Sequence, residues 1–223
     1  MNTIYLVRHG ENTANLTGEF SCKYVDYSLT PKGILQARQT AVFFKDKQID
    51  EIYASPLKRA HETADIIARE LGLPVTVIEQ FREVNVGKLE FEPPTAENWE
   101  LHNRIVFAWF AGQHELSFPD GENYLQLLKR MRDGLLEATR GKEGRNIVIV
   151  GHGGIFTFTI KDICTNIDMQ ELIRQGNHNC SVTTIELENS EERPVGLLKG
   201  WALCTHLSNE VMKFVPAAER KGI

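Results

Sequence analysis

The sequence is poor in cysteine and lacks the cysteine spacings of metal and redox motifs. Its 223 residues include four cysteines, no two of which form a C-x-x-C pair: Cys22, Cys164, Cys180 and Cys204. This excludes a zinc ribbon and a thioredoxin-like site. Reduced, partly buried thiols of a cytosolic protein are the favoured interpretation, and a disulfide between two of them is the alternative.

Long hydrophobic runs and blocks of basic charge are also missing. No apolar stretch reaches the length of a membrane-spanning helix. A charged and then apolar leader has no room before the first predicted strand, which begins at Thr3, so no signal peptide is predicted. The net charge is -5 and no basic stripe occurs, so nucleic acid is not an expected partner. We therefore predict a cytoplasmic protein that binds neither nucleic acid nor membrane.

The signatures of several enzyme classes are absent as well. The P-loop pattern does not occur, and Phe156 stands where a G-x-G-x-x-G beginning at Gly151 needs its third glycine. No G-x-S-x-G is present, which excludes the serine elbow of an α/β-hydrolase. The sequence has no H-E-x-x-H, and neither His9 nor His152 has a second ligand at metal-like local spacing, so neither a metal nor another cofactor is predicted.

What the sequence does contain is an alternation of strand-like and helix-like segments. Apolar runs of strand-forming residues at 3–8 and 147–151 have no polar alternation, which is typical of central strands covered on both faces. A cap-then-proline pair such as Ser55-Pro56 predicts the start of a helix. The pattern therefore favours a three-layer α/β/α sandwich with a largely parallel central sheet.

The length and composition predict one domain. With 42% hydrophobic residues, the chain 1–223 is expected to form a single core, and residues 85–125 are the best candidate for an insertion that forms a lid or side wall. The segment from 85 to 125 is rich in aromatic residues: Trp99, Phe107, Trp109, Phe110 and Phe118. We expect at least half of these rings to pack against the sheet. Any that line a pocket would favour a moderately apolar substrate.

Both long apolar runs end in a histidine followed by glycine. Because sites in α/β sheets form beyond the carboxyl ends of the strands, His9 and His152 are expected to meet at one sheet edge. Arg8 precedes the first histidine, and Arg59 lies one turn into the helix predicted to start at Ser55-Pro56. Guanidinium groups match phosphate oxygens in bidentate fashion. These residues therefore predict a phosphate pocket without a Walker loop.

Five segments carry a resemblance to a known family. They are LVRHGEN (6–12), DYSLTPKGILQA (26–37), YASPLKRAHETA (53–64), FREVNVGKLEF (81–91) and VIVGHGGI (148–155). In this order and spacing they resemble the motifs of the histidine phosphatase superfamily, also called phosphoglycerate mutase-like. The R-H-G motif alone is weak, but several motifs in order are specific. The resemblance covers residues 3 to about 187 and implies the phosphoglycerate mutase-like fold.

The resemblance implies a role for each residue of the pocket. His9 would be the nucleophile that accepts the phosphoryl group, while Arg8, Arg59 and His152 would hold the phosphate oxygens. Glu83 resembles the carboxylate that protonates the leaving oxygen and then activates water.

Four further positions are predicted to contact the substrate: Asn15, Ser21, Cys22 and Gly153. Asn15 resembles a residue that helps to bind the phosphate, and Cys22 stands where a glycine often contacts the substrate through its backbone. Glu90, another carboxylate of the motifs, is expected only to order its own loop.

The favoured function is that of a metal-independent phosphomonoesterase acting on a small-molecule phosphate. True phosphoglycerate mutases of this family carry an arginine pair for the substrate carboxylate, whereas the close charged candidates here are Lys88, His102 and Arg104. His102 lacks motif context and is expected to be structural or superficial. A phosphoglycerate mutase and a non-catalytic phospholigand-binding protein are the alternatives, and a homodimer is left open.

Overall fold

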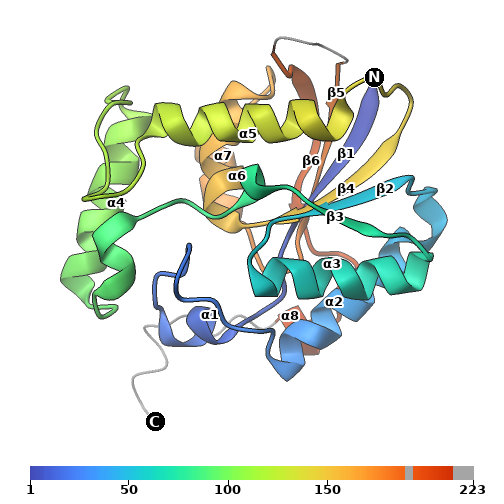
Figure 1. Cartoon of the computed structure of the whole chain (residues 1–223), viewed down its shortest axis with the longest axis horizontal. Helices are drawn as coiled ribbons and strands as arrows, with labels where there is room; N and C mark the ends of the chain where they lie inside the picture. The colour runs from blue at the N-terminus through green and yellow to red at the C-terminus, as the bar shows by residue number, and fades with distance from the viewer. Residues whose placement is uncertain (189–192, 213–223) are drawn as a thin grey trace.

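The computed structural model of the chain describes residues 1–188 and 193–212, and these residues form a central six-stranded sheet (Figure 1). The strands are β1 (Asn2–Arg8), β2 (Glu51–Ala54), β3 (Val75–Val77), β4 (Asn146–Gly151), β5 (Val182–Leu187) and β6 (Gly196–Leu203). Their order is β3-β2-β4-β1-β5-β6. The first four are parallel neighbours, whereas β5 runs antiparallel to β1 and β6 antiparallel to β5. The predicted, largely parallel sheet is confirmed.

Helices cover both faces of this sheet (Figure 1). One face carries α2 (Pro31–Phe44) and α3 (Lys58–Leu71); the other carries α5 (Tyr124–Thr139), α6 (Gly153–Thr159) and α7 (Met169–Gln175). Strand β4 explains the arrangement, because its successive side chains point to opposite faces. Ile147 and Ile149 belong to the core beneath α5, and Val148 and Val150 to the core beneath α2 and α3. The strand is apolar throughout because both of its faces are buried.

Shorter or peripheral elements complete the described fold. They are α1 (Thr13–Thr17), α4 (Ala96–Phe110) and α8 (Asn209–Met212), with 3-10 turns at η1 (Lys45–Lys47), η2 (Glu79–Phe81), η3 (Gly87–Phe91) and η4 (Ile160–Asp162). The sequence pattern did not predict α1 or α7. Both are short, and α1 depends on a reciprocal capping box between Asn12 and Asn15 rather than on an apolar face.

The helix predicted to start at Ser55-Pro56 begins later, at Lys58. The Ser55 hydroxyl accepts the Leu57 N–H at 3.3 Å, two residues on, which closes a local turn instead of capping the helix. Leu57 takes the N-cap position with no side-chain cap. Arg59 is consequently the second residue of α3, at its very start, rather than one turn into it.

The segment 85–125 is joined to itself at its two ends. The Glu122 N–H donates to the Asn85 carbonyl at 2.9 Å, and the Asn85 N–H donates to the Glu122 carboxylate at 2.7 Å. Between these points Trp109 and Phe118 are fully buried, whereas Phe107 is 63% exposed. Most of the aromatic side chains of this segment therefore pack into the core beneath α5, as expected, and a role as a lid stays a prediction.

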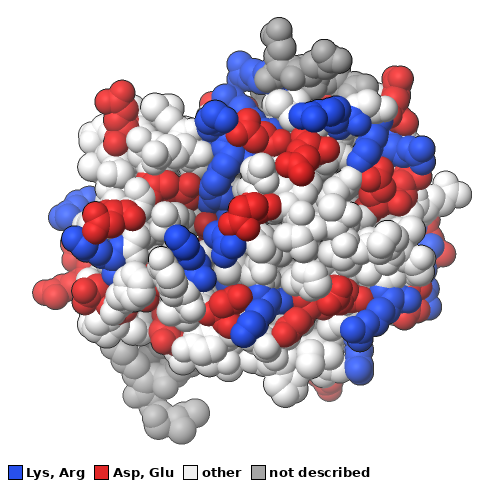
Figure 2. All heavy atoms as spheres, in the orientation of Figure 1, with Lys and Arg blue, Asp and Glu red and all other residues white. Residues whose placement is uncertain are grey.

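Charged side chains of both signs are interspersed on the face of the molecule shown in Figure 2. Several are paired in the structure, such as Lys129 with Asp133 at 2.6 Å and Lys142 with Glu51 at 2.6 Å. An exposed pair such as Lys129 with Asp133 contributes little stability, about 0–1 kcal/mol. Within residues 1–188 and 193–212, no helix combines the length and the apolar character needed to cross a bilayer.

Candidate active site

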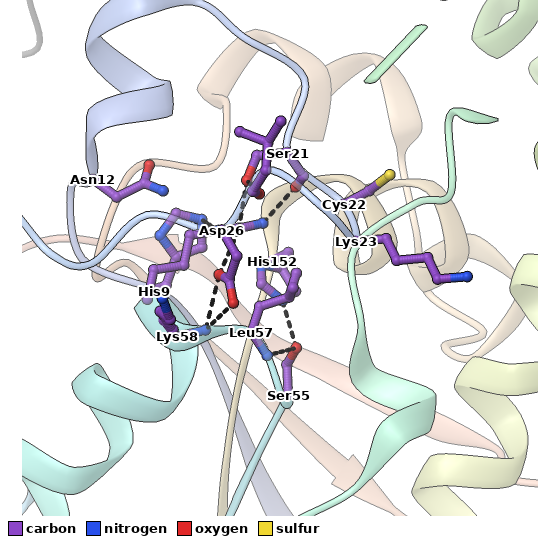
Figure 3. A network of polar contacts seen from close by, with 12 residues as sticks. His9, Asn12, Ser21, Cys22, Lys23, Asp26, Ser55, Leu57, Lys58 and His152 are labelled. Atoms are coloured by element: carbon purple, nitrogen blue, oxygen red, sulfur yellow. Dashed lines mark hydrogen bonds and ion pairs between the residues drawn. The ribbon is translucent and has the colours of Figure 1, made fainter. Parts of the chain in front are cut away.

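The two histidines lie side by side at the carboxyl ends of neighbouring strands (Figure 3). Arg8 pairs with Gly151 in the register of β1 and β4, and the His9 N–H donates to the Gly151 carbonyl at 2.9 Å. The ring centroids of His9 and His152 are 5.2 Å apart, and both side chains are buried. Their predicted convergence at one sheet edge is confirmed. The glycine after His9 is required there, because a Cβ on Gly10 would lie 2.6 Å from the Gly33 carbonyl oxygen.

The hydrogen bonds of His9 fix which ring nitrogen carries the proton. Its Nδ1 lies 2.7 Å from the Gly10 carbonyl oxygen, which can only accept, so Nδ1–H is the donor. Its Nε2 accepts the Nε–H of Arg59 at 3.0 Å. Burial lowers the pKa of His9 well below its usual range, and the charges of Arg59 and Arg8 lower it further. His9 is therefore a neutral imidazole whose Nε2 lone pair is directed into the site.

Arg59 is held at the start of α3 by the loop that precedes α2. Its guanidinium donates to the Ser21 hydroxyl at 2.9 Å and to the Ser21 carbonyl at 2.7 Å. The Asp26 carboxylate lies 3.8 Å from it and also accepts the Lys58 N–H at 3.0 Å (Figure 3). Burial lowers the pKa of Arg59 to about 10, while the charges of Glu83 and Asp26 oppose that shift. The guanidinium is thus a desolvated cation beside the histidine.

Arg8 brings a second cation to the same place from the end of β1. One of its terminal nitrogens donates to the Asn177 carbonyl, whereas its Nε is buried and has no partner among the described residues. Burial lowers its pKa, and the nearby carboxylate of Glu83 raises it. Gly153, the first residue of α6, lies so close that a Cβ there would be 3.2 Å from the Arg8 Nε.

His152 occupies the N-cap of α6 and faces the other three side chains. Its Nε2 lies 2.7 Å from the Ser55 hydroxyl, and its Nδ1 is buried without a partner in the described part of the chain. Burial lowers its pKa well below the usual range, and the charge of Arg59 adds to the effect. Arg8, His9, Arg59 and His152 are together called the phosphate pocket below, after the ligand that the sequence predicts for them. The first three line the cavity, and the buried ring of His152 lies against that of His9.

Glu83 lies beside the phosphate pocket and lines the same cavity. Its carboxylate accepts three backbone N–H groups, from Val84 at 2.8 Å, Ile155 at 2.9 Å and Gly154 at 3.1 Å. The backbone carbonyl of Glu83 in turn accepts from the Arg130 guanidinium at 3.0 Å. The carboxylate is therefore attached to the first turn of α6, next to His152, and does not stand free in an apolar setting.

The four further predicted contact residues, Asn15, Ser21, Cys22 and Gly153, all line the cavity. The Asn15 side chain accepts from the Asn179 amide at 3.0 Å and closes the capping box of α1. Backbone N–H groups of residues 22–25 all converge on one oxygen of Glu90, at 2.6–3.1 Å. The expectation that Glu90 orders only its own loop is wrong, because it binds the distant loop that holds Arg59. The Cys22 N–H is consequently already used.

The whole cavity, which Arg8, His9 and Arg59 also line, has a volume of about 350 Å³. A further group of lining residues is called the outer wall below: Glu19, Phe20, Trp99, His102 and Phe158. His102 packs against Phe20 and Trp99, with ring centroids 5.6 and 5.1 Å away, and burial lowers its pKa. The packing agrees with the expected structural role of His102, and the side chain also lines the cavity. The sequence signal for this position of His102 was its spacing of three residues from Trp99, which places both side chains on one face of the helix.

Nothing in the described residues groups three or more His, Cys, Asp or Glu side chains in a way that could hold a metal ion. All four cysteines are free thiols, and the three buried ones are Cys22, Cys164 and Cys180. Burial raises the pKa of Cys22 to about 12, so the thiol in the cavity stays protonated and is a poor nucleophile. The reactive groups of the cavity are therefore its imidazoles, guanidinium groups and carboxylate.

The fold and the cavity together define an α/β protein with a cavity lined by histidine and arginine at the carboxyl edge of its sheet. The family model of the histidine phosphatase superfamily (branch 1) matches residues 4–198, and the chain belongs to this superfamily. The family and the phosphatase class predicted from the sequence are thereby confirmed.

Individual relatives span nearly the whole chain. A putative phosphoserine phosphatase 2 of Hydrogenobacter thermophilus is 33% identical over 89% of this chain and 96% of its own. A probable phosphoglycerate mutase GpmB of Erwinia tasmaniensis is 31% identical over 92% of each chain. Among solved structures, a mutant phosphoserine phosphatase from Entamoeba histolytica in complex with phosphoserine has a TM-score of 0.74 and 30% identity, covering 93% of this chain and 100% of that one.

Proposed function

We propose that this protein is a metal-independent phosphomonoesterase that hydrolyses a small-molecule phosphate through a phosphohistidine on His9. One observation carries the proposal. The Gly10 carbonyl holds the proton on Nδ1 of His9, so that the Nε2 lone pair faces a pocket with the two guanidinium groups of Arg8 and Arg59. Such a nitrogen needs no separate base to become a nucleophile, because it is already unprotonated.

The first half-reaction transfers the phosphoryl group to the enzyme. The substrate dianion enters the phosphate pocket, and the Arg59 Nε–H turns from His9 to a phosphoryl oxygen. The Nε2 lone pair forms a bond to phosphorus while the ester P–O bond breaks. The departing alkoxide takes a proton from the Glu83 carboxyl group, which lines the same cavity. The Nδ1–H bond to Gly10 stabilises the positive charge that develops on the ring.

The second half-reaction reverses these roles with water. The Glu83 carboxylate accepts a proton from a water molecule while the water oxygen bonds to phosphorus. The N–P bond breaks, and its electron pair returns to the Nε2 of His9. Arg8, Arg59 and His152 stabilise the phosphoryl oxygens in both steps, and their burial strengthens this effect because the site holds little solvent.

We propose phosphoserine as the first substrate to test. Relatives over most of the chain are named as phosphoserine phosphatases, one of them metal-independent. The outer wall supports a small, partly polar leaving group, because it combines the aromatic rings of Phe20 and Trp99 with the Glu19 carboxylate and the His102 imidazole. A cytoplasmic location fits this proposal, since the four thiols are free and a reducing compartment keeps them so.

A phosphoglycerate mutase is the second candidate, and the GpmB relatives favour it. The cavity argues for hydrolysis. Among the described residues that line the cavity, the arginines are Arg8 and Arg59, and there is no lysine. Both guanidinium groups belong to the phosphate pocket. Lys88, an earlier candidate for a substrate carboxylate, is paired with Asp120 at 3.0 Å instead. A non-catalytic binding protein is disfavoured, because it would need neither the oriented Nε2 nor Glu83.

The test is hydrolysis of p-nitrophenyl phosphate and phosphoserine by the wild type and by His9→Ala, with and without EDTA. We expect activity that EDTA does not change and that the variant loses. His61→Ala is the matched control, because the His61 side chain is 40% exposed and, among the described residues, its ion-pair partner is Asp65 one turn along α3. Acid-quenched wild type should contain an acid-labile phosphate. Full activity in His9→Ala would refute the proposal, and interconversion of 2- and 3-phosphoglycerate faster than hydrolysis would favour the mutase.

A further inference from the structure

Ser55 follows β2 directly and is completely buried against His152. Its hydroxyl oxygen lies 2.7 Å from the His152 Nε2 and 3.3 Å from the Leu57 backbone nitrogen. Figure 3 shows the two contacts in sequence, with Ser55 between Leu57 and His152. The serine belongs to a motif segment, yet the mechanism above gives it no part.

The directions of these two hydrogen bonds follow from which groups can donate. The Leu57 N–H can only donate, so it occupies a lone pair of the Ser55 oxygen. The hydroxyl proton then needs an acceptor, and in the described structure the nitrogen within reach is the His152 Nε2. If Nε2 carried the proton instead, the buried hydroxyl would have no acceptor, which is costly. The satisfied arrangement runs from Leu57 N–H to Ser55 O–H to Nε2.

A second observation concerns the other nitrogen of the same ring. His152 is buried among cations and stays neutral, so a ring that accepts at Nε2 carries its proton on Nδ1. That Nδ1 is a buried polar atom without a partner in the described residues. Its ring lies 5.2 Å from the ring of His9, centroid to centroid, in the phosphate pocket. The ring is buried against His9, which lines the cavity, and we expect a phosphoryl oxygen bound at His9 to accept from this unpartnered N–H.

We propose that Ser55 is a positioning residue that fixes the Nδ1–H tautomer of His152 and thereby makes this histidine a hydrogen-bond donor to the phosphoryl group. The inference rests on the proposed function and deepens it. Without the serine, the ring can present a lone pair to an anionic oxygen, which repels it. With it, the donor is set before the substrate arrives, so that no reorganisation is needed during transfer.

In this arrangement the two histidines differ in the ring nitrogen that each offers to the phosphoryl group. Both rings carry the proton on Nδ1, but the Gly10 carbonyl accepts it in His9 and leaves Nε2 as the nucleophile. In His152 the Ser55 hydroxyl occupies Nε2 and leaves Nδ1–H as the donor. A backbone acceptor and a side-chain donor thus give the same tautomer opposite functions.

The test compares Ser55→Ala with Ser55→Thr, which keeps the hydroxyl, and with Thr139→Val. Thr139 is a matched control because it is a buried residue of α5 whose hydroxyl, within the described part of the chain, donates to the Leu135 carbonyl of its own helix at 2.7 Å. Long-range proton–nitrogen NMR spectra of histidine-labelled protein report the tautomer, with and without inorganic phosphate. We expect the Nδ1–H form for His152 in the wild type, in Ser55→Thr and in Thr139→Val, and a mixed or Nε2–H form in Ser55→Ala.

The kinetic expectation follows from the loss of one donor to the transferring group. The kcat of Ser55→Ala for p-nitrophenyl phosphate should fall by about 10²-fold, the loss typical of one oriented donor, with a smaller change in KM. Ser55→Thr should restore most of it. If Ser55→Ala does not fold, Ser55→Cys keeps the shape with a weaker donor and should show an intermediate kcat.

An unchanged tautomer in Ser55→Ala would overturn the proposal, and so would an unchanged kcat. Loss of activity in Ser55→Thr equal to that in Ser55→Ala would also refute it, because shape rather than the hydroxyl would then matter. The tautomer spectrum separates this failure from failure of the proposed function. A wild type that does not hydrolyse phosphate esters would refute the function, whereas the spectrum would still show whether Ser55 sets the ring.

Discussion

The contact between Gly154 and Glu83 makes Gly154→Ala a specific probe of the carboxylate. A Cβ on Gly154 would lie 2.7 Å from the Glu83 Oε1 and 2.9 Å from a methyl of Val84. Since unstrained carbon contacts need about 3.5 Å, the carboxylate must move by roughly 0.5 Å or more. The three atoms nearest to the new methyl group all belong to Glu83 and Val84. The substitution therefore displaces the proposed proton donor while the phosphate pocket is kept.

The magnitude follows from this displacement. A misplacement of about 1 Å can cost about 10²-fold in rate, so a shift of half that size should cost about 10-fold to 100-fold. Phosphoserine has a poor alkoxide leaving group and needs the proton from Glu83. Single-turnover transfer from phosphoserine should fall by this factor, whereas the burst of p-nitrophenolate, which leaves unprotonated, should be almost unchanged.

Gly72→Ala is the control for the added methyl group. Gly72 caps α3 with φ +68, and its Cβ would meet no atom within 4 Å. The left-handed backbone should cost about 1–2 kcal/mol of stability and leave both transfer rates unchanged. Rapid-quench and stopped-flow measurements on both variants decide the matter. An equal loss for the two substrates in Gly154→Ala, or no loss for phosphoserine, would show that Glu83 does not protonate the leaving group.

Two further predictions follow from the buried histidines and from Glu90. Burial lowers the pKa of His9 and His152, so below about pH 6.5 the unfolded chain binds protons that the folded chain excludes. The contribution of these two rings to the free energy of unfolding should be constant above that pH. Below it, the free energy should fall by up to about 1.4 kcal/mol per pH unit for each ring. In urea titrations at several pH values, the free energy of His152→Gln should depend less steeply on pH than that of the wild type, and an equal dependence would contradict this. Glu90→Ala removes the acceptor of four backbone N–H groups at residues 22–25, next to the Ser21 carbonyl that accepts from Arg59. Arg59 should lose this support, and the KM for phosphate esters should rise by about 10-fold. An unchanged KM would show that Glu90 does not position Arg59.

The sequence predicts the sheet well because its central strands are uniformly apolar. Residues 147–151 are buried on both faces and leave no ambiguity of period. Ser55-Pro56 was misleading because the serine hydroxyl accepts from the Leu57 N–H and lies 2.7 Å from the His152 Nε2 instead of capping a helix. Local sequence identifies a capping residue but not the distant ring that draws its hydroxyl away.

The pocket was predictable where motifs and strand ends coincide, and unpredictable where contacts are long-range. His9 and His152 follow adjacent strands, so their meeting is a consequence of topology. The attachment of Glu90 to residues 22–25 joins segments more than sixty residues apart. The place of His102 in the outer wall depends on how α4 packs, which the helix period alone does not determine.

The hydrogen bond between the Arg59 Nε–H and the His9 Nε2 has a consequence for the resting enzyme. The lone pair that would attack phosphorus is covered by a cation whenever no anion is present, so the imidazole is masked against electrophiles. Only a ligand that offers Arg59 a better acceptor uncovers it. A dianionic oxyanion does so and an uncharged alkylating agent does not. We therefore expect the selectivity of His9, the proposed nucleophile, to arise before any contact with the remainder of the substrate.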